Sequence, residues 1–160
     1  MPKLQPHELD AFDRAILDLI QVDAGTPLRL IGERVNLSTA ATQRRIRRLK
    51  ERGVIQAQVA VVDPECVGRP ITILVEVQAE RTHGADLDAM KAQLSGPEIQ
   101  QCYYVTGSAD FLLVLTVASM ADYEALARRL FYENRNVKSF QTIIAMDRVK
   151  VGLTVPISAA

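Results

Sequence analysis

The chain has 160 residues and a mass of 17.7 kDa, with 48% apolar and 24% charged residues. This length allows one medium domain or two small ones, and the apolar share excludes disorder along the whole chain. No stretch approaches the roughly 18 uninterrupted apolar residues of a membrane span, and the polar start lacks the apolar region of a secretory signal. We therefore expect a soluble, cytoplasmic protein.

Charge is distributed unevenly, although the formal net charge is zero. Residues 29–52 carry eight cationic and two anionic side chains, a net +6, so the rest of the chain carries −6. A basic block in an otherwise acidic protein indicates a local surface for a polyanion. The separation of charge also predicts two domains.

The first third of the chain has helical periodicity. Apolar residues recur every three or four positions from Leu9 to Val22, which predicts an amphipathic helix. A second helix is expected over 28–35, a tight turn at 36–38, and a third helix from Thr39 to about Arg52. A basic helix after a short helix and a tight turn is the helix-turn-helix arrangement that enters the major groove of DNA.

In that geometry the first turn of the third helix faces base edges and its later cations face phosphates. The alternative is a solvated basic face, but six cations against one anion over 39–52 lack the usual acidic partners. The candidate DNA-binding residues are Ser38, Thr39, Ala40, Gln43, Arg44, Arg47, Arg48 and Lys50, with Arg52 as a further phosphate contact.

After Gly53 the apolar period changes from 3.6 to 2, and residues 54–62 are predicted to form a strand or wing. The proline-containing segment 63–70 is the expected linker. Beyond it we expect a βαββαβ order, an α+β ferredoxin-like fold with an antiparallel sheet and both helices on one face. The expected elements are strand 71–79, helix 84–94, strand 99–106, strand 111–117, helix 119–132 and a long strand region from 137 to about 155.

A second candidate site is the turn at 106–110, between two apolar strands. Its small residues, hydroxyls and single carboxylate suit a zwitterionic ligand. The same residue types also make an ordinary hairpin, so both interpretations stay open at this point. The candidate ligand-binding residues are Tyr104, Thr106, Gly107, Ser108, Ala109 and Asp110.

Metal and cofactor chemistry have little support in the sequence. Cys66 and Cys102 form neither a C-x-x-C pair nor a disulfide framework, and His7 and His83 lie far apart. There is no phosphate-binding loop, dinucleotide fingerprint or recognisable nucleophile–base pair. We expect no metal, no cofactor and no enzymatic activity.

The chain resembles the Lrp/AsnC (leucine-responsive, feast/famine) transcriptional regulators over nearly its whole length. The residues that carry the resemblance are Leu9-Asp10-x-x-Asp13 with Ile16-Leu17 and Gln21-x-Asp23, Val35-Asn36-Leu37-Ser38, Arg44-Arg45-Ile46-x-Arg48-Leu49, Gly53-Val54-Ile55, Asp63-Pro64-Glu65-x-x-Gly68, Val105-Thr106-Gly107-x-x-Asp110-Phe111-Leu112-Leu113 and Met146-x-x-Val149-Lys150.

The resemblance implies a winged helix-turn-helix domain over 1–62, the linker over 63–70, and a ligand-sensing and oligomerisation domain over 71–160. It also implies homodimers that assemble into octamers, double-stranded DNA as a partner, and an amino-acid effector bound between dimers at the Gly107–Asp110 turn. We expect such a regulator to associate with the nucleoid. The alternative is an architectural protein that organises DNA without a ligand.

Overall fold

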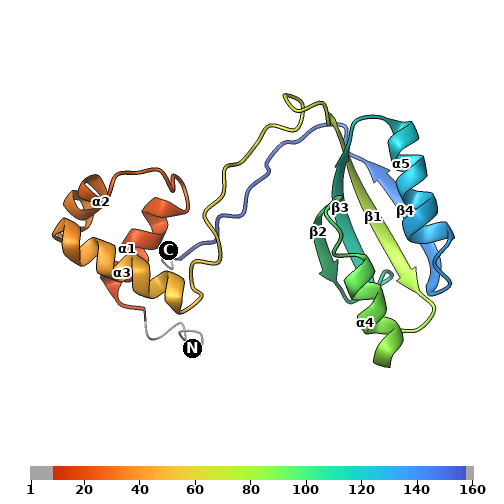
Figure 1. Cartoon of the computed structure of the whole chain (residues 1–160), viewed down its shortest axis with the longest axis horizontal. Coiled ribbons are helices and arrows are strands. Elements are labelled where there is room, and N and C mark those ends of the chain that lie inside the picture. Colours follow the sequence, from red (N-terminus) through yellow and green to blue (C-terminus); the bar gives the residue numbers. More distant parts are fainter. Residues whose placement is uncertain (1–8, 158–160) are drawn as a thin grey trace. The chain divides into compact units, whose positions relative to one another are not determined.

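The computed structural model describes residues 9–157, which form two compact units (Figure 1). One unit comprises residues 9–61 together with 150–157, and the other comprises residues 62–149. No helix in the described part of the chain is long and apolar enough to cross a membrane. Because the first unit contains a segment on each side of the second unit in the sequence, the chain passes from one unit to the other twice, after residue 61 and after residue 149.

The first unit is built from the helices α1 (Ala11–Ile20), α2 (Leu28–Val35) and α3 (Thr39–Glu51). Their apolar faces form one core, in which Ile16 and Leu49 are fully buried. Both α1 and α3 begin at side chains that accept a hydrogen bond from the first turn, which stabilises a helix start. The carboxylate of Asp10 accepts from Asp13 N at 2.8 Å, and Ser38 Oγ accepts from Ala41 N at 3.2 Å.

The turn between α2 and α3 is set by Asn36, which adopts the left-handed conformation at φ 56°. Asparagine tolerates this conformation better than most residues, and it ends α2 two residues before the cap of α3. Gly32 allows the close approach of the two helices, because a Cβ atom there would lie 2.6 Å from the carbonyl oxygen of Leu37. The helix-turn-helix geometry thus follows from local residues.

The expected strand over 54–62 is absent. The segment contains no strand in the structure, because no other part of the described chain pairs with it. Val54 and Ile55 pack against the helical core, but the later apolar side chains are exposed to water, Val59 by 70% and Val61 by 92%.

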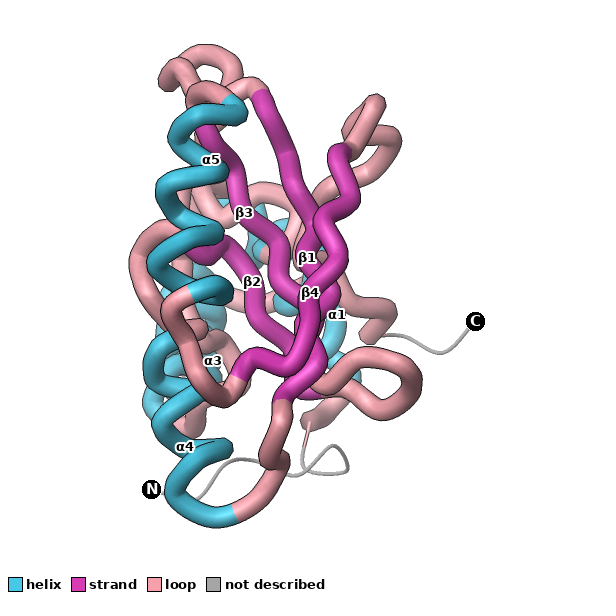
Figure 2. Tube along the Cα trace, turned by 90° about the vertical axis from the view of Figure 1, so that its right-hand side faces the viewer, coloured by secondary structure: helices cyan, strands magenta, loops and turns pink. Residues whose placement is uncertain are grey.

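The second unit has the βαββαβ order that the sequence predicts. Its strands are β1 (Ile71–Ala79), β2 (Ile99–Tyr104), β3 (Phe111–Val117) and β4 (Val137–Ile144), arranged in the order β2-β3-β1-β4 with every neighbouring pair antiparallel. The helices are α4 (Gly84–Gln93) and α5 (Met120–Ala127), and α5 continues into a π-helical turn over Arg128–Tyr132. Figure 2 shows both helices along the same side of the sheet.

One face of the sheet forms the core of this unit. Alternate residues of β1 and β3, from Ile73 to Val77 and from Phe111 to Val117, are buried against α4 and α5. Met90 of α4 and Phe131 of the π-helical turn are almost completely buried in the same cluster. The alternation matches the period of two in a strand, so the remaining residues lie on the open face.

Two strands are shorter than the sequence predicts. β2 ends at Tyr104 rather than Thr106, because Tyr104 pairs with Phe111, where β3 begins. β4 ends at Ile144 rather than near Val155, because Ile144 pairs with Ile73 and β1 begins only two residues earlier. A strand cannot extend beyond the neighbour that fills its hydrogen bonds.

The C-terminal segment leaves the sheet unit and belongs to the helical unit. The Gln21 side chain accepts from Val155 N at 2.9 Å and donates to Val155 O at 2.9 Å. Arg14 donates to the carbonyl of Ile157, whose side chain packs against the helical core. Residues 150–157, which the sequence predicts as part of the sensing domain, contact α1 and Gln21 in the structure.

Replacing Gln21 by alanine will release the C-terminal segment from α1. Each lost hydrogen bond is worth about 0.5–1.5 kcal/mol, so amides of residues 150–157 will exchange faster with deuterium while the core of the helical unit stays protected. The matched control is Gln43→Ala, since Gln43 is exposed on α3. Equal exchange of the segment in both variants would contradict the anchoring role of Gln21.

Candidate DNA interface and ligand-binding turn

The third helix presents most of the residues that the sequence predicts as DNA contacts. All eight of them are exposed. Thr39, Ala40, Gln43 and Arg44 occupy the first two turns of α3, while Ser38 Oγ is engaged in capping the helix. The structure thus gathers these residues on one element, although their contacts with DNA stay a prediction.

The cations of α3 differ in how their charge is balanced. Arg45 and Arg48 are paired with the carboxylates of α1, and Arg47 lies 3.8 Å from Glu51 in an exposed pair that contributes little. Arg44 and Lys50 have no ion-pair partner within residues 9–157. The sequence divides these cations only by their expected contact with bases or phosphates, whereas the structure also separates cations with a carboxylate partner from cations without one.

An ion cluster joins the start of α1 to the middle of α3. Arg45 Nη1 lies 2.7 Å from Asp10 Oδ2 and 2.8 Å from Asp13 Oδ1, and Arg48 donates to Asp13 Oδ2. Partial desolvation raises the pKa of Asp10, but the Asp13 N–H and the Arg45 guanidinium together outweigh it, so the pKa lies below its usual value. The guanidinium of Arg45 also lies 5.2 Å from the centre of the Phe12 ring.

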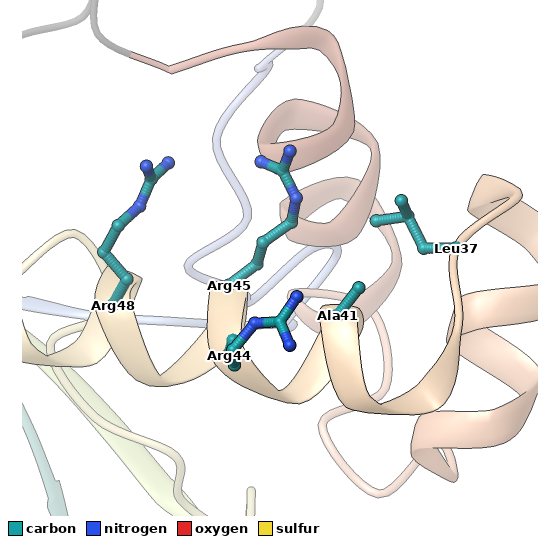
Figure 3. A pocket seen from close by; sticks show the side chains of 5 residues that line it. All are labelled: Leu37, Ala41, Arg44, Arg45 and Arg48. Atoms are coloured by element: carbon teal, nitrogen blue, oxygen red, sulfur yellow. The ribbon is translucent and has the colours of Figure 1, made fainter.

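Beside this cluster α3 carries an open hollow of about 330 Å³. It is lined by Leu37, Ala41, Arg44, Arg45 and Arg48, which Figure 3 shows around it. The side chains of Arg45 and Arg48 extend to the same side of the helix, whereas the guanidinium of Arg44 turns toward Ala41. Three guanidinium groups around one concavity suit a phosphate oxygen.

The predicted ligand-binding residues lie in the connection between β2 and β3. Thr106, Gly107 and Ser108 are exposed, and Gly107 has φ 129°, a conformation that side chains rarely adopt. Tyr104 is 51% exposed, with its ring 5.1 Å from that of Phe111 and Lys91 Nζ 5.2 Å from its centre. The turn itself offers exposed hydroxyl groups, and the end of β2 that leads into it carries an aromatic ring with a cation from α4 over it.

Asp110 has a structural task in this turn. Its Oδ2 accepts from Ala79 N at 2.8 Å, and Ala79 stands at the point where the pairing of β1 with β4 shifts register. Its backbone also bonds to Val77 O at 2.9 Å and to Val105 N at 2.8 Å. Asp110 thus closes the turn and satisfies an irregular position of the sheet, which agrees with the hairpin interpretation of this residue.

A second set of polar contacts ties the turn to the sheet. Gln78 donates to the carbonyl of Ser108, and Ser139 Oγ of β4 donates to Gln78 Oε1 at 2.7 Å. Sequence reasoning missed Gln78 and Ser139, as well as Asp13 and Arg45 in the ion cluster. The marks Leu9-Asp10-x-x-Asp13 and Arg44-Arg45-Ile46-x-Arg48-Leu49 contain Asp13 and Arg45, but neither mark indicates that these residues pair.

Neither cysteine lies in a reactive environment. Burial raises the pKa of the Cys102 thiol, and the nearby carboxylates of Asp63 and Glu65 raise that of Cys66. Over residues 9–157 no group of three or more histidine, cysteine or acidic side chains could hold a metal ion. His7, which the sequence analysis considered, lies outside the described residues.

Replacing Asp110 by alanine will lower the free energy of unfolding of the sheet unit by about 1–3 kcal/mol, because the buried N–H of Ala79 loses its acceptor. Tyrosine fluorescence during chemical denaturation reports this unit alone, since it contains all four tyrosines, Tyr103, Tyr104, Tyr123 and Tyr132. Ser108→Ala is the control because Ser108 is exposed. Equal stability of both variants would rule out this role of Asp110.

Two family models match the chain. The model described as winged helix-turn-helix DNA-binding matches residues 9–56, and the model described as Lrp/AsnC ligand binding domain matches residues 72–155. The first covers the three helices and the second covers the sheet and both of its helices. These are the two domains of a DNA-binding transcriptional regulator.

Relatives agree with the models. An uncharacterized HTH-type transcriptional regulator, y4tD, of Sinorhizobium fredii is 43% identical over 94% of this chain and 89% of its own. The leucine-responsive regulatory protein of Haemophilus influenzae is 30% identical over 94% and 91%. The crystal structure of an AsnC family transcriptional regulator from Agrobacterium tumefaciens superposes with a TM-score of 0.86, at 29% identity, over 93% of this chain and 97% of that one. The chain therefore belongs to the Lrp/AsnC family of transcriptional regulators.

Proposed function

We propose that this regulator binds specific DNA sequences through α3 and that an amino acid bound at the β2–β3 turn, between neighbouring dimers, changes its assembly and its affinity for DNA. Dimers assemble into an octamer, and the protein acts in the cytoplasm on the nucleoid. The observation that carries the proposal is the presence of an exposed basic recognition helix and a ligand-binding domain on one chain.

Docking of α3 in the major groove is supported by the exposed first turns of the helix. Thr39, Gln43 and Arg44 project from this end, and such side chains recognise base edges. Arg44 at the hollow and Lys50, which has no ion-pair partner among the described residues, supply positive charge for the phosphates of the DNA backbone. Because phosphate contacts supply much of the affinity and base contacts the selectivity, both kinds of group are needed on one helix.

An amino-acid effector is supported by the chemistry of the turn. The exposed hydroxyls of Thr106 and Ser108 and the cation of Lys91 over Tyr104 suit a carboxylate. Asp110 uses Oδ2 to accept from Ala79 N, and its Oδ1 suits the ammonium group of an amino acid. A zwitterionic amino acid needs a donor or cation for its carboxylate and an acceptor for its ammonium group. The name of the leucine-responsive relative also favours an amino acid over other small ligands.

Assembly is supported by the open face of the sheet. The strand register places apolar side chains on the face opposite α4 and α5, which a second copy of this chain would cover. These side chains are Leu74, Tyr103, Leu112, Val114 and Ile143.

The test of the function uses the full chain and a duplex that it selects from a random-sequence pool. We expect one chemical class of amino acid to raise the thermal midpoint, since a ligand at about 100 times its Kd stabilises by about 2.7 kcal/mol. The same amino acid will change the affinity for the selected duplex by about 5–150-fold, the usual range of allosteric coupling. Selection of a duplex without a response to any amino acid would instead favour a ligand-independent organiser of DNA.

Replacing Leu112 by aspartate will dissociate the dimer, because it places a second carboxylate beside Glu76, its cross-strand neighbour on the open face, where a second copy would have to bury it. Sedimentation will show a smaller species, while helix content measured by circular dichroism stays the same. Met120→Asp is the matched control, since Met120 is 44% exposed on α5. Sedimentation of the Leu112 variant like that of the control would contradict this interface.

A further inference from the structure

The carboxylate of Asp13 is fully buried in the first turn of α1, where a charge is unfavourable unless it is paired. Its Oδ1 accepts from Arg45 Nη1 at 2.8 Å, and its Oδ2 accepts from Arg48 Nη2. Both oxygens are thus engaged, each by a different arginine of α3. The orientation of these two guanidinium groups is therefore determined from α1.

The same two arginines reach the surface that the helix offers to DNA. The side chain of Arg45 is 26% exposed and that of Arg48 is 48% exposed, and both line the hollow beside Arg44. They stand three positions apart, on one face of the helix. Asp13 has no exposed surface of its own, yet it pairs with two of the three guanidinium groups that line the hollow.

Asp13 also limits the charge of this surface. Asp10 and Asp13 balance Arg45 and Arg48, so Arg44 alone carries unbalanced charge into the hollow. Binding to any duplex rises with the number of phosphates that unbalanced cations neutralise. Discrimination between sequences depends instead on donors held in a fixed register.

We propose that Asp13 is a positioning residue for DNA recognition: it fixes Arg45 and Arg48 at the hollow and withholds their charge from sequence-independent binding. This rests on the proposed docking of α3 on DNA. The role differs from the phosphate contact that the sequence alone assigns to Arg48, because the structure gives this cation a buried carboxylate as its partner.

The decisive variant is Asp13→Asn, which keeps the shape and removes the charge. Binding is followed by fluorescence anisotropy over a series of salt concentrations, with the duplex selected by the unmodified protein and with a mixed-sequence duplex. We expect the logarithmic salt dependence on the mixed duplex to steepen by about one. The ratio of affinities for the two duplexes will fall by about tenfold, the effect of one mismatched base pair.

Glu33→Gln is the matched control, because it also removes one negative charge from an arginine pair, with Arg29, but on the exposed face of α2. Its salt dependence and its affinity ratio will match those of the unmodified protein. A merely structural role of Asp13 would reduce the fraction of active protein without altering the salt dependence. An unchanged salt dependence in Asp13→Asn therefore overturns the proposal.

A second pair of variants keeps the proposal testable where Asp13→Asn does not fold. Arg44→Ala will make the salt dependence shallower by about one, whereas Arg48→Ala will change it far less because Asp13 already balances that charge. Equal reductions in both variants would overturn the role of Asp13 while leaving the docking of α3 intact. No reduction in either would overturn the docking itself, and the role of Asp13 with it.

Discussion

A buried carboxylate determines how the helical unit is put together. The apolar cluster that includes Ile16 and Leu49 holds α1 and α3 together, but apolar contacts have little directional preference. The ion pairs of Asp13 are directional, and removing one partner of a buried pair typically costs 3–5 kcal/mol, about half or more of the stability of many domains. The angle at which α3 presents its side chains is thus a consequence of electrostatics as much as of packing.

The sheet unit uses a carboxylate in a comparable way. Asp110 fills the acceptor position that the register shift at Ala79 leaves open, and Gln78 links the turn to Ser139 of β4. The turn is consequently part of the sheet rather than a loose loop beside it. A ligand held by the hydroxyl groups of the turn would act on backbone that is bonded directly to β1.

Most elements could be predicted because their signals are local. The period of 3.6 located α2 over 28–35, and the apolar run of β3 located it over 111–117. The failures concern partners distant in sequence: β4 stops near the first residues of β1, and 54–62 has no strand partner in the described chain. Asp13 and Arg48 are 35 positions apart, so no pattern in either helix indicates their pairing. The roles of the predicted contact residues depend on such pairings.

Helix α1 contacts both α3 and the C-terminal segment. Its first turn holds α3 through Asp13, and its last residues lead to Gln21, which holds the C-terminal segment through Val155. This segment leaves the sheet unit after residue 149, and the linker enters the unit after residue 61. The sheet unit is therefore joined to the helices at both of its ends. The C-terminal segment is thus bonded to the helix whose first turn also holds Arg45 and Arg48 of α3.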